Sequence, residues 1–453
     1  MAYSVGLVSL GCAKNQVDGE IMLAALQKAG CRIESDASHA DAVIINTCGF
    51  IDDAKSEAID TILSFARLKS EGKIRAILVT GCLAERYREE VMKEMPEVDA
   101  VLGIGADSDI AAAVENALEG KKIQSFPEKN CLPLCGERRL LTPRWTAYLK
   151  IAEGCDNRCA YCAIPMIRGR YRSRTLESVE REARALAAGG AKELVLIAQD
   201  TTRYGLDRYG RLMLPELLRR LCRIEGLEWI RVLYGYPDTV TDELLESLAS
   251  EKKIVRYMDL PLQHCNGEIL RSMGRRGSRG ELESLVAKMR RAVPGLVIRT
   301  TLIAGYPGET EEQFEELCGF VRKMRFERMG CFAYSQEEGT AAAALPDQLP
   351  EEEKRRRAEM VMEIQMNIMQ EQGEQMAGKT LRVLAEGYDR DAGLWYGRSY
   401  MDSPDVDGRV YFQARGAQPV PGRFIRVNIT GCDDGDLTGV AEEQGAAEDE
   451  PAE

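Results

Sequence analysis

The chain is poor in histidine, in tryptophan and in long apolar runs. It has 453 residues, of which two are histidines, three are tryptophans and 6% are aromatic. The only histidines are His39 and His264, so the sequence offers few ligands for a zinc site of mixed cysteine and histidine. No stretch approaches the ~18 uninterrupted apolar residues of a membrane span. The N-terminus, MAYSVGLVSLGC, lacks a basic segment followed by an apolar segment and a cleavage site. We therefore expect a cytoplasmic protein without membrane association.

The chain also lacks an excess of positive charge, since its formal net charge is −13. This balance argues against a protein that coats nucleic acid through bulk electrostatics, and it suits a basic protein as partner. A local basic patch could still contact RNA, which the composition does not favour. Cysteine is abundant, with 14 residues. In a long chain without an export signal, metal binding or catalysis is a better explanation for them than disulfides.

Three apolar runs in the first 120 residues each end in a cysteine. VGLVSLGC, AVIINTC and AILVTGC end at Cys12, Cys48 and Cys82, and each precedes a helix-like segment. This alternation predicts a flavodoxin-like α/β domain with a parallel sheet buried on both faces. The carboxyl ends of parallel strands lie at one edge, so these cysteines, the N-terminal triad, can converge as a metal site with three thiolates. The alternative is three separate buried cysteines.

Strands and helices alternate again from 141 to 372. Six strand candidates predict a parallel barrel or a partial (βα) TIM-like barrel, with its chemistry at the carboxyl ends of the strands. Residues 121–140 are expected to be a linker, in which Cys131 and Cys135 are free, half-exposed thiols.

The character of the sequence changes after the central domain. Residues 373–441 contain short β-rich runs separated by Gly, Pro and Asp, which predicts a small antiparallel β-barrel. Residues 442–453 are acidic and are expected to be a disordered tail.

The stretch GCDNRCAYC holds a second set of three cysteines, the central triad of Cys155, Cys159 and Cys162. One tight loop with this spacing can supply three thiolates to three irons of a [4Fe–4S] cube and leave the fourth iron open. Its place after the first strand of a βα barrel resembles the radical S-adenosylmethionine (SAM) superfamily. In that superfamily the open iron chelates the amino and carboxylate groups of SAM, and an electron from the cluster cleaves SAM to methionine and a 5′-deoxyadenosyl radical.

The same resemblance implies five cofactor-binding residues. Tyr161 precedes the last cysteine of the central triad, where an aromatic residue is common in the superfamily, although it could serve only loop packing. Gln199 and Asp200 end a strand beside the presumed SAM pocket. Gly305 and Gly308 lie in IAGYPGE, which is similar to the superfamily's adenine-side loop. Taken alone, that stretch is a turn before an acidic helix start.

The run IRGRYRSR places Arg168, Arg170, Arg172 and Arg174 at a period of two. If extended, these side chains share one face. They form either a solvated basic strip or a patch for the carboxylate of SAM, an acidic side chain or an RNA phosphate.

The order of the three modules resembles the methylthiotransferases over nearly the whole chain, and the last module is similar to their TRAM domain. SLGCAKNQVD, INTCGFIDDAKSEAID, GCDNRCAYCAIPMIRGRYRSR and DLPLQH are similar to the branch that modifies an aspartate on the twelfth protein of the small ribosomal subunit. The tRNA-modifying branch typically reads differently after its first cysteine and has a serine in place of His264.

This resemblance implies two [4Fe–4S] clusters, one on each triad, with SAM as the second cofactor. The central cluster cleaves SAM, and the resulting radical abstracts hydrogen from the β-carbon of the target aspartate. The N-terminal cluster carries the sulfur or methylsulfide that joins that carbon, and a second SAM supplies the methyl group. No catalytic acid or base is assigned, because an unactivated C–H bond has no useful acidity. The sulfur donor and the electron donor stay open.

Two other functions are retained. A tRNA adenosine (N6-isopentenyl or threonylcarbamoyl) methylthiotransferase would need a basic surface with aromatic residues. Trp395, Tyr396 and Tyr400 with Arg398 keep that function open, but eight basic against six acidic residues in 379–432 are a poor basis for counterion-driven binding. A non-catalytic iron–sulfur redox protein would not need a complete barrel with a glycine loop.

Overall fold

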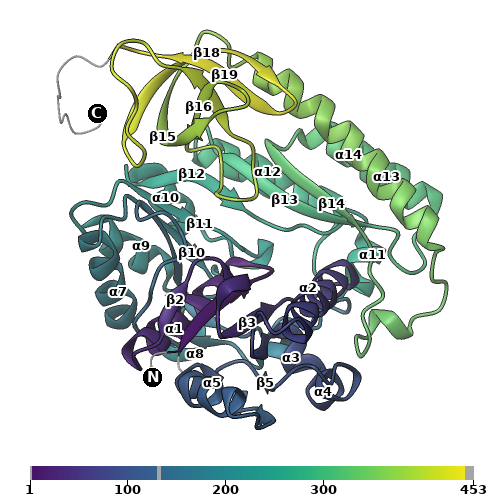
Figure 1. Cartoon of the computed structure of the whole chain (residues 1–453). Helices are drawn as coiled ribbons and strands as arrows, with labels where there is room; N and C mark the ends of the chain where they lie inside the picture. Colours follow the sequence, from purple (N-terminus) through teal and green to yellow (C-terminus); the bar gives the residue numbers. More distant parts are fainter. Residues whose placement is uncertain (1–2, 130–133, 444–453) are drawn as a thin grey trace.

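The computed structural model describes residues 3–129 and 134–443, in which three modules follow one another along the chain. The N-terminal α/β domain and the C-terminal barrel lie at opposite ends of the molecule, with the central domain between them (Figure 1). Cys131 and residues 444–453 of the acidic tail lie outside the described residues. Of the helices in the described ranges, none combines the length and apolar composition that a bilayer crossing requires.

The N-terminal domain is a six-stranded parallel sheet with the order β2-β1-β3-β4-β5-β6. Its central strands, β3 and β4, are buried along their whole length, as their continuous apolar sequences predict. The order confirms the flavodoxin-like prediction. The last strand lies within the segment expected to be a linker. The strands are β1 (Ser4–Ser9), β2 (Arg32–Glu34), β3 (Ala42–Thr47), β4 (Ala76–Gly81), β5 (Ala100–Leu102) and β6 (Ile123–Ser125).

Helices cover both faces of this sheet. One apolar cluster joins α1 and α5 to one face, and a second joins α2, α3 and α4 to the other. The helices are α1 (Ala13–Lys28), α2 (Asp52–Ser70), α3 (Cys82–Tyr87), α4 (Glu89–Glu94) and α5 (Ile110–Leu118).

The central domain is a second six-stranded parallel sheet, with the order β14-β13-β12-β11-β10-β7. It runs in chain order from one edge to the other without closing, which confirms the partial barrel. The strands are β7 (Thr146–Lys150), β10 (Glu193–Ile197), β11 (Trp229–Val232), β12 (Ile254–Asp259), β13 (Val297–Ala304) and β14 (Arg328–Ala333). A short hairpin of β8 (Ala152–Glu153) and β9 (Arg172–Ser173) follows β7.

Helices pack onto the outer side of the sheet, and the apolar core of the domain lies between the two layers. They are α7 (Leu176–Ala188), α9 (Leu214–Cys222), α10 (Asp242–Ser250), α11 (Gly267–Ser272), α12 (Arg279–Ala292) and α13 (Glu311–Met324). The short helices α6 (Ile164–Arg168), which packs against α3, and α8 (Leu206–Tyr209), which lies beside β9, belong to loops.

The long helix α14 (Glu351–Glu374) packs against α13 and β14 and leads to a closed barrel with the order β15-β16-β17-β19-β18. The barrel is antiparallel except where β17 pairs with β19 in parallel. Its strands are β15 (Thr380–Asp389), β16 (Leu394–Arg398), β17 (Val410–Gln413), β18 (Phe424–Asp433) and β19 (Asp436–Ala441).

Buried ion pairs fix the barrel on the central sheet. Glu193 accepts from Arg398 of the barrel at 2.7 Å and from Arg231 at 2.9 Å. Arg328 donates to Asp402 of the barrel at 2.6 Å. All these side chains are buried, and a buried charge that loses its partner is costly, so the pairs define one docked orientation.

Candidate iron–sulfur centres

The structure brings the N-terminal triad together at the carboxyl edge of its sheet. Cys12 precedes α1, Cys48 follows β3, and Cys82 begins α3 directly after β4. Burial raises the pKa of the Cys82 thiol to about 12. Cys82 Sγ lies 3.5 Å from Asn15 Oδ1 in the first turn after Cys12, and a Cβ at Gly11, the residue before Cys12, would lie 3.1 Å from Cys48 Sγ. Gly81 makes the approach possible. Its φ is +94°, and a Cβ there would lie 2.4 Å from the Thr47 carbonyl oxygen.

The central triad occupies the loop after β8. Burial raises the pKa of Cys155 to about 11 and that of Cys162 to about 12, and each also feels the charge of Cys159. The loop is held by the backbone N–H of Ala160, which donates to the carbonyl of Met273 at 2.8 Å. The three cysteines of this triad therefore lie on one loop whose backbone is held in place.

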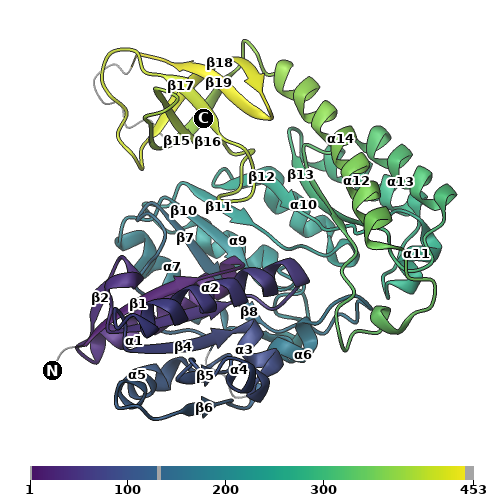
Figure 2. The same cartoon turned by 45° about the vertical axis from the view of Figure 1, so that its right-hand side comes forward.

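The two triads belong to neighbouring segments. Cys82 packs in one apolar cluster with Ala163 and Ile167, which directly follow the central triad. Helices α3 and α6, which begin at or just after the last cysteine of each triad, lie side by side (Figure 2). A group bound at one triad is therefore close to a group bound at the other.

Each donor set consists of three thiolates, which is the ligand type of iron–sulfur clusters. Within residues 3–129 and 134–443, no three His, Cys, Asp or Glu side chains converge tightly enough to hold one metal ion. A [4Fe–4S] cube distributes its thiolates over separate irons, so its ligands stand further apart than those of a mononuclear site. Iron also deprotonates coordinating thiols, which removes the effect of burial on their pKa.

A buried arginine stands beside each triad. Arg168 is fully buried, and its Nη2 lies 3.8 Å from Cys82 Sγ. Arg275 is also buried, and its Nη1 lies 3.8 Å from Cys159 Sγ. Hydrogen bonds to cluster sulfurs stabilise the reduced, more negative form and so tune its potential. Sequence reasoning identified neither role.

The expectation that IRGRYRSR forms one basic face is wrong. Arg168 ends α6, and Gly169 then adopts a φ of +72°, so the period of two is broken after the first arginine. Arg174 is buried and bonds to the carbonyl of Lys150 at 2.7 Å, while Arg170 is 82% exposed. The arginines thus point to different environments.

Arg168 instead joins a buried network with no net charge. It donates to Glu153 at 3.1 Å and to Asp18 at 3.1 Å, and Lys150 bonds to the same two carboxylates. It also donates to Asn15 Oδ1 at 2.6 Å. Glu153 lies two residues before Cys155 and Asn15 three residues after Cys12, so the network connects both cysteine segments.

The predicted SAM-pocket residues near the central triad have defined environments. Tyr161 accepts from Arg275 at 3.4 Å. Gln199 is half-buried at the end of β10. Asp200 accepts from Asn157 at 2.9 Å and from Thr202 at 2.8 Å, so its carboxylate braces the cysteine loop.

The glycine loop follows β13, as expected. Gly305 and Gly308 have φ values of +74° and +77°, and the N–H of Gly305 donates to Glu309 at 2.5 Å. Glu309 also pairs with Arg357 at 3.1 Å and with His264 at 3.0 Å. His264 is therefore a buried residue that supports this loop.

Two tyrosines at the end of β11 lie between the triads and were not identified from the sequence. Tyr236 has its hydroxyl 4.0 Å from Cys159 Sγ, and Arg275 stacks 4.2 Å from its ring centroid. The ammonium of Lys14 lies over the ring of Tyr234, 3.2 Å from the ring centroid. The position of LYGY after a strand of the parallel sheet was the available signal, since functional side chains gather at such ends. No local pattern indicated Arg275.

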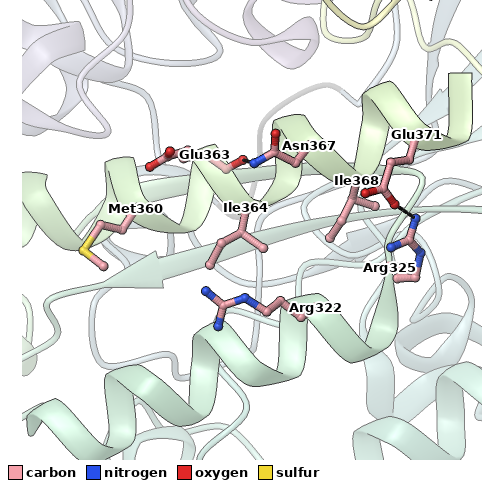
Figure 3. Close-up of a pocket in the computed structure, with 8 residues that line it drawn as sticks. All are labelled: Arg322, Arg325, Met360, Glu363, Ile364, Asn367, Ile368 and Glu371. Carbon is pink, nitrogen blue, oxygen red and sulfur yellow. Dashed lines mark hydrogen bonds and ion pairs between the residues drawn. The ribbon is translucent and has the colours of Figure 1, made fainter. Parts of the chain in front are cut away.

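A groove of about 480 Å³ lies between α13 and α14, away from the cysteines (Figure 3). Its walls include Arg322, Ile364 and the ion pair of Arg325 with Glu371 at 2.7 Å. It contains no residue of either triad and is not part of the candidate centres.

Three family models match successive parts of the chain. The uncharacterized protein family UPF0004 matches residues 4–103, the radical SAM superfamily matches 149–321, and the TRAM domain matches 377–441. These ranges correspond to the three modules of the structure.

Curated relatives match almost the full chain. A ribosomal protein uS12 methylthiotransferase RimO from Pelotomaculum thermopropionicum is 50% identical over 441 residues, covering 97% of this chain and 99% of that protein. The protein of the same name from Lachnoclostridium phytofermentans is 47% identical over 96% of this chain and 99% of its own length.

A solved structure shares the fold at low identity. The radical SAM methyltransferase TsrM from Kitasatospora setae, with tryptophan substrate and a SAM analogue bound, is 16% identical with a TM-score of 0.55. The match covers 86% of this chain and 79% of that one.

Proposed function

We propose, because this chain belongs to the family of ribosomal protein uS12 methylthiotransferases, that it transfers a methylthio group to the β-carbon of an aspartate in uS12. The observation that carries the proposal is the placement of two cysteine triads on neighbouring segments, with Tyr234 and Tyr236 between them. A target side chain in that space would meet both cofactors.

Each triad holds one [4Fe–4S] cluster in this proposal. The central cluster, with SAM, supplies the hydrogen abstraction that an unactivated C–H bond requires. The protein contributes binding and shielding. Tyr161 and Arg275 pack beside Cys159, Asp200 braces the cysteine loop, and Gly305 lets the backbone turn beside the adenine-side pocket.

The charge of the chain suits this substrate. A net charge of −13 would steer a basic ribosomal protein toward the enzyme, and the effect should weaken as salt rises. We place the reaction in the cytoplasm, where ribosomal proteins are made and assembled.

The structure of the C-terminal barrel argues against the alternative of a tRNA substrate. Arg398, expected beside Trp395 on an RNA-binding face, is buried and paired with Glu193 at 2.7 Å. That arginine is not available to a phosphate.

The test offers the reconstituted enzyme purified uS12 and purified tRNA side by side, with SAM, a reductant and a sulfide source. The expected result is the mass gain of one methylthio group on the uS12 aspartate. Modified adenosine in the tRNA with an unchanged uS12 would assign the chain to the tRNA reaction, and SAM cleavage without transfer to either would contradict both.

A further inference from the structure

Lys14 carries a buried positive charge that no carboxylate balances in the described parts of the chain. The residue is 4% exposed, and its ammonium lies 3.2 Å from the centroid of the Tyr234 ring. No carboxylate in the described parts of the chain forms an ion pair with it. Lys150, which is equally buried, pairs with both Asp18 and Glu153. A cation–π contact compensates only part of the cost of burying an ammonium, so the Lys14 site is suited to an anion.

The position of Lys14 favours a substrate as that anion. Lys14 lies in the first turn of α1, two residues after Cys12, while its partner Tyr234 belongs to the central domain. Tyr236 on the same loop reaches Cys159 at 4.0 Å. The ammonium therefore stands between the two triads, where a reacting side chain has to enter.

Another cation already serves the sulfurs of the N-terminal triad. Arg168 lies 3.8 Å from Cys82 Sγ and is held there by Glu153 and Asp18. The charge of Lys14 also lowers the pKa of Cys12 against the effect of burial, but no carboxylate among the described residues holds its ammonium, which rests on the face of an aromatic ring. A ring face engages one side of an ammonium that has three donors.

Tyr234, on which the ammonium of Lys14 rests, has a well-fixed backbone. Tyr234 has a φ of +60°, which is uncommon for a residue with a bulky side chain. Its N–H donates to Asp259 at 3.0 Å, and its carbonyl accepts from the N–H of Thr201 at 2.9 Å. The backbone that carries the ring is thus fixed before any ligand arrives, which limits the ordering cost of binding.

We propose that Lys14 binds the side-chain carboxylate of the target aspartate and so holds its β-carbon between the two centres. This assignment rests on the proposed function, since an adenosine substrate offers no carboxylate at its reacting carbon. A lysine ammonium provides charge-assisted hydrogen bonds of the kind that select a carboxylate over its neutral analogues.

The experiment measures binding of uS12 to the cluster-loaded full chain with SAM, under anaerobic conditions. It compares the wild type with Lys14→Met, and natural uS12 with uS12 in which the target aspartate is alanine or asparagine. Losing a hydrogen bond to a charged group should weaken binding of natural uS12 to the variant about 10- to 100-fold. The same variant should bind the alanine substrate as the wild type does.

Lys55→Met is the matched control. Lys55 also lies in the N-terminal domain and is largely buried, but it pairs with Glu337 at 3.0 Å, which Arg86 continues to satisfy. This variant should keep the full preference for aspartate over alanine. The asparagine substrate tests the proposal on the wild type alone, without any enzyme variant, and should bind as weakly as natural uS12 binds to Lys14→Met.

Several outcomes overturn the proposal. Equal weakening of the aspartate and alanine substrates, or a loss of iron in Lys14→Met, would show that Lys14 serves the cluster or the fold. A wild type that binds all three substrates equally would exclude recognition of the carboxylate. Transfer of the methylthio group to tRNA alone is a separate result, since it rejects the proposed function and with it the carboxylate ligand.

Discussion

Arg398 Nη2 donates to Glu193 Oε2 over 2.7 Å, joining the C-terminal barrel to the first pair of strands of the central sheet. Both residues are buried, and Glu193 also accepts from Arg231. The pKa of Glu193 is lowered, because the two guanidinium groups outweigh the effect of burial. The carboxylate is thus charged in the folded protein, and removing one arginine leaves a buried charge with a single partner.

Arg398→Met should destabilise the docked barrel by about 3–5 kcal/mol, since it breaks a buried ion pair on one side only. Denaturant unfolding followed by tryptophan fluorescence would measure the change. Arg426→Met is the control, because Arg426 is 70% exposed and its pair with Glu442 should contribute about 0–1 kcal/mol. Equal effects of the two variants would contradict the buried pair as the docking element.

The reconstituted chain should bind about eight irons and eight sulfides, as two cubane clusters require. Replacing Cys155, Cys159 and Cys162 together with alanine should halve the iron content. The matched control replaces three cysteines outside the triads, Cys31, Cys222 and Cys432, and should leave the iron content unchanged. Loss of all iron in the first variant would contradict two independent centres.

Loss of the central triad and loss of the N-terminal triad should affect different steps of the reaction. Cys159→Ala should abolish formation of 5′-deoxyadenosine from SAM, because the central cluster is lost. Cys48→Ala should still cleave SAM but should transfer no methylthio group. Chromatography of the nucleoside and mass spectrometry of uS12 measure the two steps separately. A Cys48→Ala protein with normal transfer would assign the N-terminal triad to structure.

Gly81→Ala should disturb the N-terminal centre more than an ordinary glycine substitution does. The conformation of Gly81, with φ +94° and ψ −157°, costs a residue with a Cβ about 1–3 kcal/mol. At Gly81 that Cβ would also meet the Thr47 carbonyl oxygen at 2.4 Å, whereas at Gly30, with φ +88°, nothing lies within 4 Å. Gly81→Ala should therefore lose more stability than Gly30→Ala and should bind less iron. Equal losses in thermal unfolding and iron assays would exclude the close approach as the reason for glycine.

The strand ends and the cysteines were predictable from the sequence, because both are local patterns. An apolar run of six residues that ends in cysteine predicts a buried strand and its edge, and β3 before Cys48 follows that pattern. The parallel pairing of β17 with β19 was not predictable, since it depends on how the barrel closes.

The environment of Arg168 could also not be predicted from local sequence patterns. Its spacing indicated a surface strip, but its partner Asp18 is 150 positions away in the sequence. Whether an arginine is a solvated charge or part of a buried network depends on such distant partners. The same holds for Lys14, whose contact with Tyr234 crosses two domains.

The buried network around Arg168 limits how this protein can vary. Its charged members come from α1, β7, β8 and α6, so the N-terminal domain supplies one carboxylate, that of Asp18, and the central domain supplies the other three charges. A hybrid that took its first domain from a relative without this aspartate would leave an excess positive charge buried at the seam. The two modules are therefore expected to be inherited as a pair, whereas the loops on their outer surfaces can diverge freely.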